Sequence, residues 1–159
     1  MAHPIEKVRH NQLLKEMSAE ELKVLSAIVS EKSLPENATI FVENMHGEAL
    51  YIILDGVVKV SKMIEEGEEK TLSILNNGDV LGEMALLGGG PRLITARAMK
   101  STRLLTIKRS DFQTLLEKEP KVCIKFFNGL VNLFSQRINQ ADGKIKELLL
   151  YPSSPRQRH

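Results

Sequence analysis

The chain has 159 residues, of which 42% are hydrophobic and 26% charged, the size and composition of one globular domain. Its 22 lysines and arginines balance 20 acidic residues, so the net charge of +2 gives no indication of a nucleic-acid partner. The single cysteine excludes an internal disulfide, and the absence of a long apolar run or a secretory signal predicts a cytoplasmic protein.

The first region, up to about Lys32, has helical patterns. Ser18 and Glu21 have the spacing of a capping box, in which each side chain bonds the other residue's backbone N–H. An apolar stripe at helical spacing follows them, and the segment from Val8 to Met17 is a shorter helix candidate. The sequence therefore predicts helices within residues 8–32, with an inward stripe of Leu22, Leu25, Ile28 and Val29.

The middle region, residues 34–108, has the short apolar runs and frequent turns of an antiparallel β-barrel of the jelly-roll type. Asp55 and Gly56 stand between two apolar runs and predict a hairpin, because a tight two-residue turn favours such residues at positive φ. The charged segment 65–69 and the segment 76–79 are further turns. The predicted strands are Ala38–Val42, Leu50–Leu54, Val57–Val60, Lys70–Leu75, Ile94–Met99 and Arg103–Lys108.

The third region, residues 110–150, is helical again. Ser110 and Gln113 predict a second capping box, and Pro120 ends this helix and begins another that runs to about Leu150. The first half of its apolar stripe could pack equally well against its own domain or against a second subunit. The second half favours packing against the same helix of a second subunit. The stripe contains Phe127, Leu130, Phe134, Ile138, Ala141, Ile145 and Leu148. The single domain thus spans residues 1–151, and the polar, Pro-rich tail 152–159 is expected to be disordered.

Residues 80–96 combine groups suited to a sugar phosphate. Gly82 allows a close backbone approach, and the next residues have room for about one turn of helix, whose first N–H groups favour an anion. Three glycines and Pro91 then return the chain, so that Arg92 comes back near Glu83. A guanidinium suits a phosphate, whereas a carboxylate accepts hydrogen bonds from hydroxyls. The alternative is that Glu83 and Arg92 simply form a structural salt bridge with each other.

This segment resembles the phosphate-binding cassette of cyclic nucleotide-binding domains, the family of the cAMP receptor protein and of protein kinase A regulatory subunits. The family pattern is roughly Phe-Gly-Glu-x-Ala-Leu, a short variable stretch, Pro-Arg, two small residues and Thr. It is matched in type and spacing by Gly82, Glu83, Ala85, Leu86, Pro91, Arg92 and Thr95. Weaker similarity extends over about residues 10–150.

The resemblance implies that Glu83 accepts the ribose 2′-hydroxyl, that Arg92 clamps the cyclic phosphate, and that two backbone amides contact the same phosphate. It also implies a lid over the base, expected within residues 141–151. The implied ligand-binding residues are Gly82, Glu83, Met84, Ala85, Leu86, Pro91, Arg92, Leu93 and Thr95, with Leu72, Ser73 and Leu81 along the sugar or base. The amides are those of Ala85 and Leu86.

Three residues depart from the family pattern. Leu81 replaces the usual aromatic residue, and Leu93 and Ile94 stand where small residues are usual. Family members that prefer cGMP often carry Thr or Ser directly after the arginine, and Leu93 offers no such donor. The sequence therefore favours cAMP over cGMP as the ligand. The alternative is a sensor of the same fold for another small ligand, or a protein-interaction module that binds no nucleotide.

Catalysis and DNA binding are not expected. The histidines cannot form a barrel metal site, because only His46 of the four lies within the barrel region, and no Ser or Cys has an evident His partner. Nine residues after Leu150 leave no room for a DNA-reading helix. The sequence thus predicts a non-enzymatic sensor with a homodimer partner, an unidentified output protein, no cofactor or metal, and no membrane contact. The other histidines are His3, His10 and His159.

Overall fold

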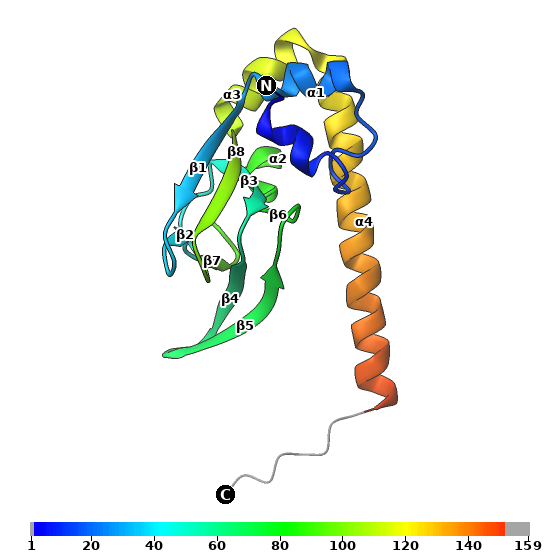
Figure 1. Ribbon diagram of the computed structural model, residues 1–159. Helices are drawn as coiled ribbons and strands as arrows, with labels where there is room; N and C mark the ends of the chain where they lie inside the picture. The colour runs from blue at the N-terminus through cyan, green and yellow to red at the C-terminus, as the bar shows by residue number, and fades with distance from the viewer. Residues whose placement is uncertain (1, 152–159) are drawn as a thin grey trace, which may run out of the picture.

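The computed structural model describes residues 2–151, in which eight strands lie between two helical regions (Figure 1). The helices are the 3₁₀ helix η1 (Pro4–Val8), α1 (Ala19–Ser26), α2 (Met84–Leu87), α3 (Arg109–Lys118) and α4 (Pro120–Leu150). The strands are β1 (Val29–Leu34), β2 (Thr39–Phe41), β3 (Ala49–Asp55), β4 (Val58–Glu65), β5 (Glu68–Leu75), β6 (Val80–Leu81), β7 (Thr95–Ala98) and β8 (Thr102–Lys108). The predicted tail 152–159 lies outside the described residues.

The strands form two antiparallel four-stranded sheets, with the orders β1-β8-β3-β6 and β2-β7-β4-β5. The sheets pack face to face, as their shared core shows, and this confirms the predicted antiparallel jelly-roll class in a flattened form. The core between them is made by Phe41, Ile53, Val58, Leu81, Ala96 and Leu104.

The prediction of a hairpin at Asp55–Gly56 is wrong. The strand β3 pairs with β6 and β8, whereas β4 pairs with β5 and β7, so the dipeptide is a corner at which the chain changes sheets. Gly56 has φ of 133°, and a Cβ there would lie 2.3 Å from the hydroxyl oxygen of Thr102. Because β3 is buried and takes a partner on each edge, the next strand has no free edge of β3 to join.

The N-terminal region differs from its prediction in two places. The helix α1 ends at Ser26, and the chain from Val29 to Leu34 forms β1, paired with β8 along its full length. Val29 is β-branched and suits a strand, and ladder hydrogen bonds with β8 outweigh the helical spacing. The predicted helix over residues 8–17 is replaced by η1 and a series of turns.

The two predicted capping boxes have different outcomes. The box at Ser18 is confirmed, because its hydroxyl accepts from the Glu21 N–H at 3.2 Å and the Glu21 carboxylate accepts from the Ser18 N–H at 2.8 Å. The box at Ser110 is wrong, because α3 begins at Arg109, directly after β8, so that Lys108 is the N-cap and Ser110 lies within the first turn. Pro120 is the first residue of α4, as predicted.

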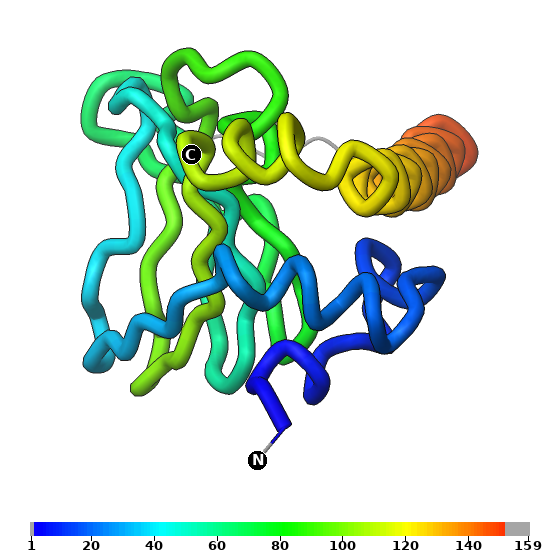
Figure 2. Tube along the Cα trace, turned by 90° about the horizontal axis from the view of Figure 1, so that it is seen from above, coloured from blue at the N-terminus to red at the C-terminus, as the bar shows by residue number. Residues whose placement is uncertain are grey.

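The helix α4 is buried in the domain only along its first half. At Gly129 the helix meets the N-terminal segment so closely that a Cβ would lie 1.9 Å from the Leu13 carbonyl oxygen. Its buried residues are Val122, Cys123, Phe126, Gly129, Leu130 and Leu133. Beyond them the helix extends past the sheets, and Ile138, Ile145 and Leu148 of the predicted stripe are exposed (Figures 1 and 2). Within residues 2–151, none of the helices has the length and apolar character needed to cross a membrane.

Candidate functional site

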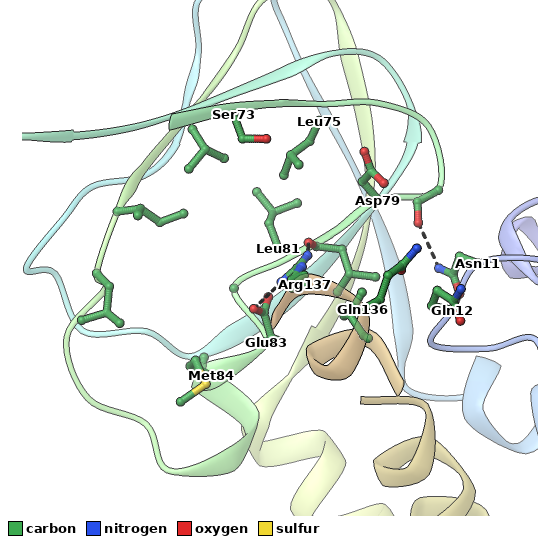
Figure 3. Close-up of a pocket in the computed structure, with 18 of the residues that line it drawn as sticks. Asn11, Gln12, Ser73, Leu75, Asp79, Leu81, Glu83, Met84, Gln136 and Arg137 are labelled. Atoms are coloured by element: carbon green, nitrogen blue, oxygen red, sulfur yellow. Dashed lines mark hydrogen bonds and ion pairs between the residues drawn. The ribbon is translucent and has the colours of Figure 1, made fainter. Parts of the chain in front are cut away.

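A pocket of about 1200 Å³ opens between the sheets, the helix α2 and the middle of α4 (Figure 3). Its walls come from segments far apart in the sequence: the N-terminal segment 7–12, the strands β5 and β6, the loop 89–94 and one face of α4. The strands of the jelly roll thus form the floor of the pocket. The helix α4 forms one wall and continues into its own exposed C-terminal half.

The backbone of Arg92 is hydrogen-bonded through both its N–H and its carbonyl group. Its N–H donates to the Met45 carbonyl at 2.7 Å, and its own carbonyl accepts from the Asn44 N–H at 2.8 Å. The side chain is only 8% exposed and turns inward, where its guanidinium lies 4.2 Å from the centre of the Phe41 ring. These contacts fix one orientation of the guanidinium at the pocket wall.

The guanidinium of Arg92 is buried without a carboxylate partner among the described residues. Its two terminal nitrogens donate to the carbonyls of Ala49 at 2.9 Å and Gly82 at 3.2 Å, and its Nε has no partner. Burial lowers the pKa of Arg92, and the neighbouring Tyr51 phenol and Glu83 carboxylate oppose this effect. A buried cation that contacts only neutral groups retains an unneutralised charge, which favours an anion at this wall.

Two glycines make room for this guanidinium. A Cβ on Gly82, where φ is 74°, would lie 2.6 Å from a terminal nitrogen of Arg92. A Cβ on Gly47 would lie 2.9 Å from its Nε. The close approach predicted for Gly82 is therefore confirmed, although the group it admits is the arginine of the same segment.

Glu83 pairs with Arg137 of α4, with 2.5 Å between the carboxylate and the guanidinium, and not with Arg92. Arg137 also donates a hydrogen bond to the Val80 carbonyl. The alternative of a structural Glu83–Arg92 salt bridge is therefore wrong for this structure. Leu93 is 65% exposed, and both Leu93 and Ile94 line the pocket.

The short helix after Glu83 is the single turn that the sequence predicted. The Ala85 N–H donates to the Gly82 carbonyl at 3.2 Å, and the Leu86 N–H donates to the Glu83 carbonyl at 3.1 Å. Both amides predicted to contact a phosphate are therefore occupied within the turn, and a bound phosphate would have to share or replace these bonds.

Most of the predicted site residues line the pocket, and three do not. The side chain of Leu86 is buried in the core, and Leu72 is exposed on β5. Thr95 is buried, and its hydroxyl accepts from the Glu43 N–H at 3.0 Å. The predicted residues that do line the pocket are Ser73, Leu81, Gly82, Glu83, Met84, Ala85, Pro91, Arg92 and Leu93.

The sequence did not single out the part of α4 that reaches the pocket. The expected lid range began at Ala141, whereas the helix lines the pocket mainly through earlier residues: Leu133, Gln136, Arg137 and Gln140, followed by Ala141 and Lys144. A signal for Arg137 was present, because it lies four residues after buried Leu133 and seven after buried Leu130, on the inward face. A charged residue at such a position needs a partner within the domain.

Comparisons with known proteins agree with this geometry. The family model of the cyclic nucleotide-binding domain matches residues 31–119, more than half of the chain. The cyclic AMP receptor protein of Thermus thermophilus is 31% identical over 126 residues, which are 79% of this chain and 56% of the relative. The chain spans about half the length of the curated relatives first matched.

Solved structures show the same fold. A cyclic nucleotide-binding domain from Methylobacillus flagellatus superimposes with a TM-score of 0.81 at 25% identity, covering 96% of this chain and 85% of that chain. The regulatory domain of Toxoplasma gondii PKA, solved with cAMP, gives 0.63 at 28% identity and covers 69% of this chain and 42% of that chain. The jelly roll, the cassette and these matches together show that the chain belongs to the cyclic nucleotide-binding domain family.

Proposed function

We propose that this domain binds cAMP and acts as a regulatory sensor. The observation that carries the proposal is the buried, unneutralised guanidinium of Arg92, which lines the same open pocket as the Glu83 carboxylate. In this proposal Arg92 binds the cyclic phosphate, and Glu83 accepts a hydrogen bond from the ribose 2′-hydroxyl. The apolar side chains of Leu75 and Leu81 contact the base or sugar.

Two further parts of the proposal concern selectivity and chemistry. The preference for cAMP over cGMP rests on Leu93, an exposed side chain without a hydroxyl at the position after the arginine. The proposed role is regulatory and not catalytic, because the relatives named above are a receptor and a regulatory domain. That this segment does not itself bind DNA stays a prediction.

A ligand titration tests the binding proposal. We expect cAMP at 100 times its Kd to raise the free energy of unfolding by about 2.7 kcal/mol, because the ligand binds only the folded state. For a domain of this size that corresponds to a rise in Tm of roughly 5–10 °C. The measurement is a thermal melt of protein refolded to remove any nucleotide acquired during expression. An unchanged Tm with both cAMP and cGMP would favour a sensor of another ligand or a protein-interaction module.

We propose that ligand binding changes the position of α4, and that Arg137 couples the pocket to this helix. Arg137 connects the helix to Glu83 and to the Val80 carbonyl, which both belong to the pocket. A ribose hydroxyl that approaches Glu83 competes with Arg137 for the same carboxylate. Ligand binding therefore changes the contact that positions the second half of α4.

Replacing Arg137 with methionine should separate binding from this signal. Without ligand, we expect proteolysis after residue 133 to rise about fivefold, because a half-buried ion pair contributes about 1 kcal/mol. Addition of cAMP should then have no further effect on the digestion rate, although cAMP still binds. Lys146→Met, on an exposed part of the same helix, is the control and should keep the ligand effect. A normal ligand effect in Arg137→Met would contradict the coupling role.

We also propose that α4 pairs in parallel with α4 of a second copy. Exposed β-branched residues recur on the helix at intervals of seven: Ile124, Val131, Ile138 and Ile145. Three residues after each of them stand Phe127, Phe134, Ala141 and Leu148, so the two series form the a and d positions of a heptad repeat. β-Branched residues at a favour two-stranded parallel coiled coils.

A further inference from the structure

The guanidinium of Arg92 lies over aromatic rings that come from different sheets. Its central carbon is 4.2 Å from the centre of the Phe41 ring, on β2, and 5.8 Å from the centre of the Tyr51 ring, on β3. The two ring centres are 6.1 Å apart, with 26° between the ring planes. The two sheets of the jelly roll thus bring one stacked aromatic pair to the position of the buried cation.

The strands that carry these rings are also connected to the other contacts of Arg92. Tyr51 belongs to β3, which supplies the Ala49 carbonyl that accepts from Arg92. Phe41 belongs to β2, which pairs with β7, the strand that follows the cassette. Both side chains pack on the core between the sheets. The position of each ring is therefore fixed by sheet hydrogen bonds and core packing, and it does not depend on a bound ligand.

An aromatic pair can orient a guanidinium in a way that a carboxylate cannot. A carboxylate would neutralise the cation and accept hydrogen bonds from its N–H groups, which would then be lost to an anionic ligand. A ring attracts the cation with its negative face, while the N–H donors point outward in the plane of the guanidinium. Among the described residues Arg92 has only carbonyl acceptors, and its Nε has none. The rings therefore contribute to its orientation without neutralising its charge.

We propose that Phe41 and Tyr51 are positioning residues that hold the Arg92 guanidinium for the phosphate of the ligand. This inference rests on the proposed cAMP binding and adds to it two residues that act through Arg92. The alternative is that the rings only fill the core, since Phe41 belongs to the cluster between the sheets. The two roles differ in one measurable respect. A positioning ring loses part of its effect when Arg92 is absent, whereas a ring that only fills space keeps all of it.

Removal of a ring should weaken cAMP binding although the arginine is still present. In Phe41→Leu and in Tyr51→Leu, which keep an apolar side chain, we expect the Kd for cAMP to rise about fivefold, the effect of one cation–π contact. Tyr51→Phe keeps the ring and should bind within about twofold of wild type. Leu104→Val is the matched control, because it removes packing from the same core cluster outside the pocket, and it should keep the wild-type Kd. Calorimetry at one ionic strength measures these values.

A cycle of variants without ligand separates positioning from packing. Urea denaturation gives the unfolding equilibrium constants of wild type, Phe41→Leu, Arg92→Ala and the double variant. Phe41→Leu should change this constant about fivefold less in the Arg92→Ala background than in wild type, because the cation that the ring contacts is then absent. Leu104→Val should change the constant by the same factor in both backgrounds.

Two results would overturn the inference. The first is wild-type affinity in both Phe41→Leu and Tyr51→Leu, and the second is an equal effect of Phe41→Leu on stability with and without Arg92. If Phe41→Leu does not fold, Tyr51→Leu takes its place in the same cycle. If wild type binds neither cAMP nor cGMP, the proposed function is overturned, while the cycle without ligand still decides whether the rings hold the guanidinium.

Discussion

Replacing Arg92 with alanine should weaken cAMP binding at least about 100-fold, a loss of about 2.8 kcal/mol in binding free energy. Among the described residues that line the pocket, Arg92 carries the only buried charge, and its neutral contacts leave that charge available to the proposed phosphate. Hydrogen bonds to charged groups contribute about 1.5–3 kcal/mol each, and two of them would be lost. The measurement is calorimetry with wild type and variant at the same ionic strength.

Two variants separate this effect from unfolding. Arg92→Lys keeps the charge but loses the planar fork, and we expect it to bind at least about tenfold more weakly than wild type. Arg97→Ala, on an exposed position of β7 outside the pocket, should bind normally. Glu83→Ala should weaken binding without abolishing it, because it leaves the phosphate contact in place. Wild-type affinity in Arg92→Ala would show that the ligand lies elsewhere.

The stability of Arg92→Ala should change less than its affinity. Its loss removes one donor from the Ala49 carbonyl and one from the Gly82 carbonyl, which still accepts from the Ala85 N–H. A buried carbonyl that loses its donor costs about 1–3 kcal/mol where water cannot reach it. The same change removes a desolvated charge that has no carboxylate partner, which offsets part of this cost. Because the pocket is open to water, we expect a decrease in unfolding free energy of at most about 2 kcal/mol, measured by urea denaturation.

The cassette could be predicted from the sequence because its residues are neighbours in the chain. Gly82, Glu83 and Arg92 lie within eleven positions, and backbone constraints alone bring them to one end of the jelly roll. The order of charged and small residues in such a segment is therefore informative without knowledge of the rest of the fold. The single turn of α2 follows from the same local pattern, whereas the fixed position of Arg92 also depends on its backbone hydrogen bonds with Asn44 and Met45.

The partner of Glu83 could not be predicted in this way, because it comes from 54 residues further along the chain. Whether Arg137 reaches the pocket depends on the angle of α4, and that angle is set by contacts such as that of Gly129 with Leu13. The prediction of a hairpin at Asp55–Gly56 was wrong for a related reason, because the partners of each strand are determined by the packing of the whole sheet. Local patterns predicted the elements well and their partners poorly.

The double variant Ile138→Asp/Ile145→Asp should convert the proposed dimer of this domain into a monomer. Ile138 is 67% exposed and Ile145 is 56% exposed in the single chain, so neither side chain is needed for the fold. In a parallel pair both residues occupy a positions, and the dimer buries two copies of each. Burial of an isoleucine contributes about 1.5–3 kcal/mol, and an unpaired carboxylate in its place is strongly unfavourable. We therefore expect the dissociation constant of the dimer to rise at least about 1000-fold.

Sedimentation equilibrium over a range of protein concentrations measures this change. Asn132→Asp/Asn139→Asp is the matched control, because it introduces two aspartates on the same helix at the positions that directly follow Val131 and Ile138, outside the a and d positions. The control should remain a dimer, and both variants should keep the wild-type Tm at concentrations where all three proteins are monomers. If wild type is monomeric at every concentration, the heptad pattern serves another partner. If Ile138→Asp/Ile145→Asp still forms a dimer, the two copies contact each other through a different surface. The exposed face of α4 is then free to contact an output protein.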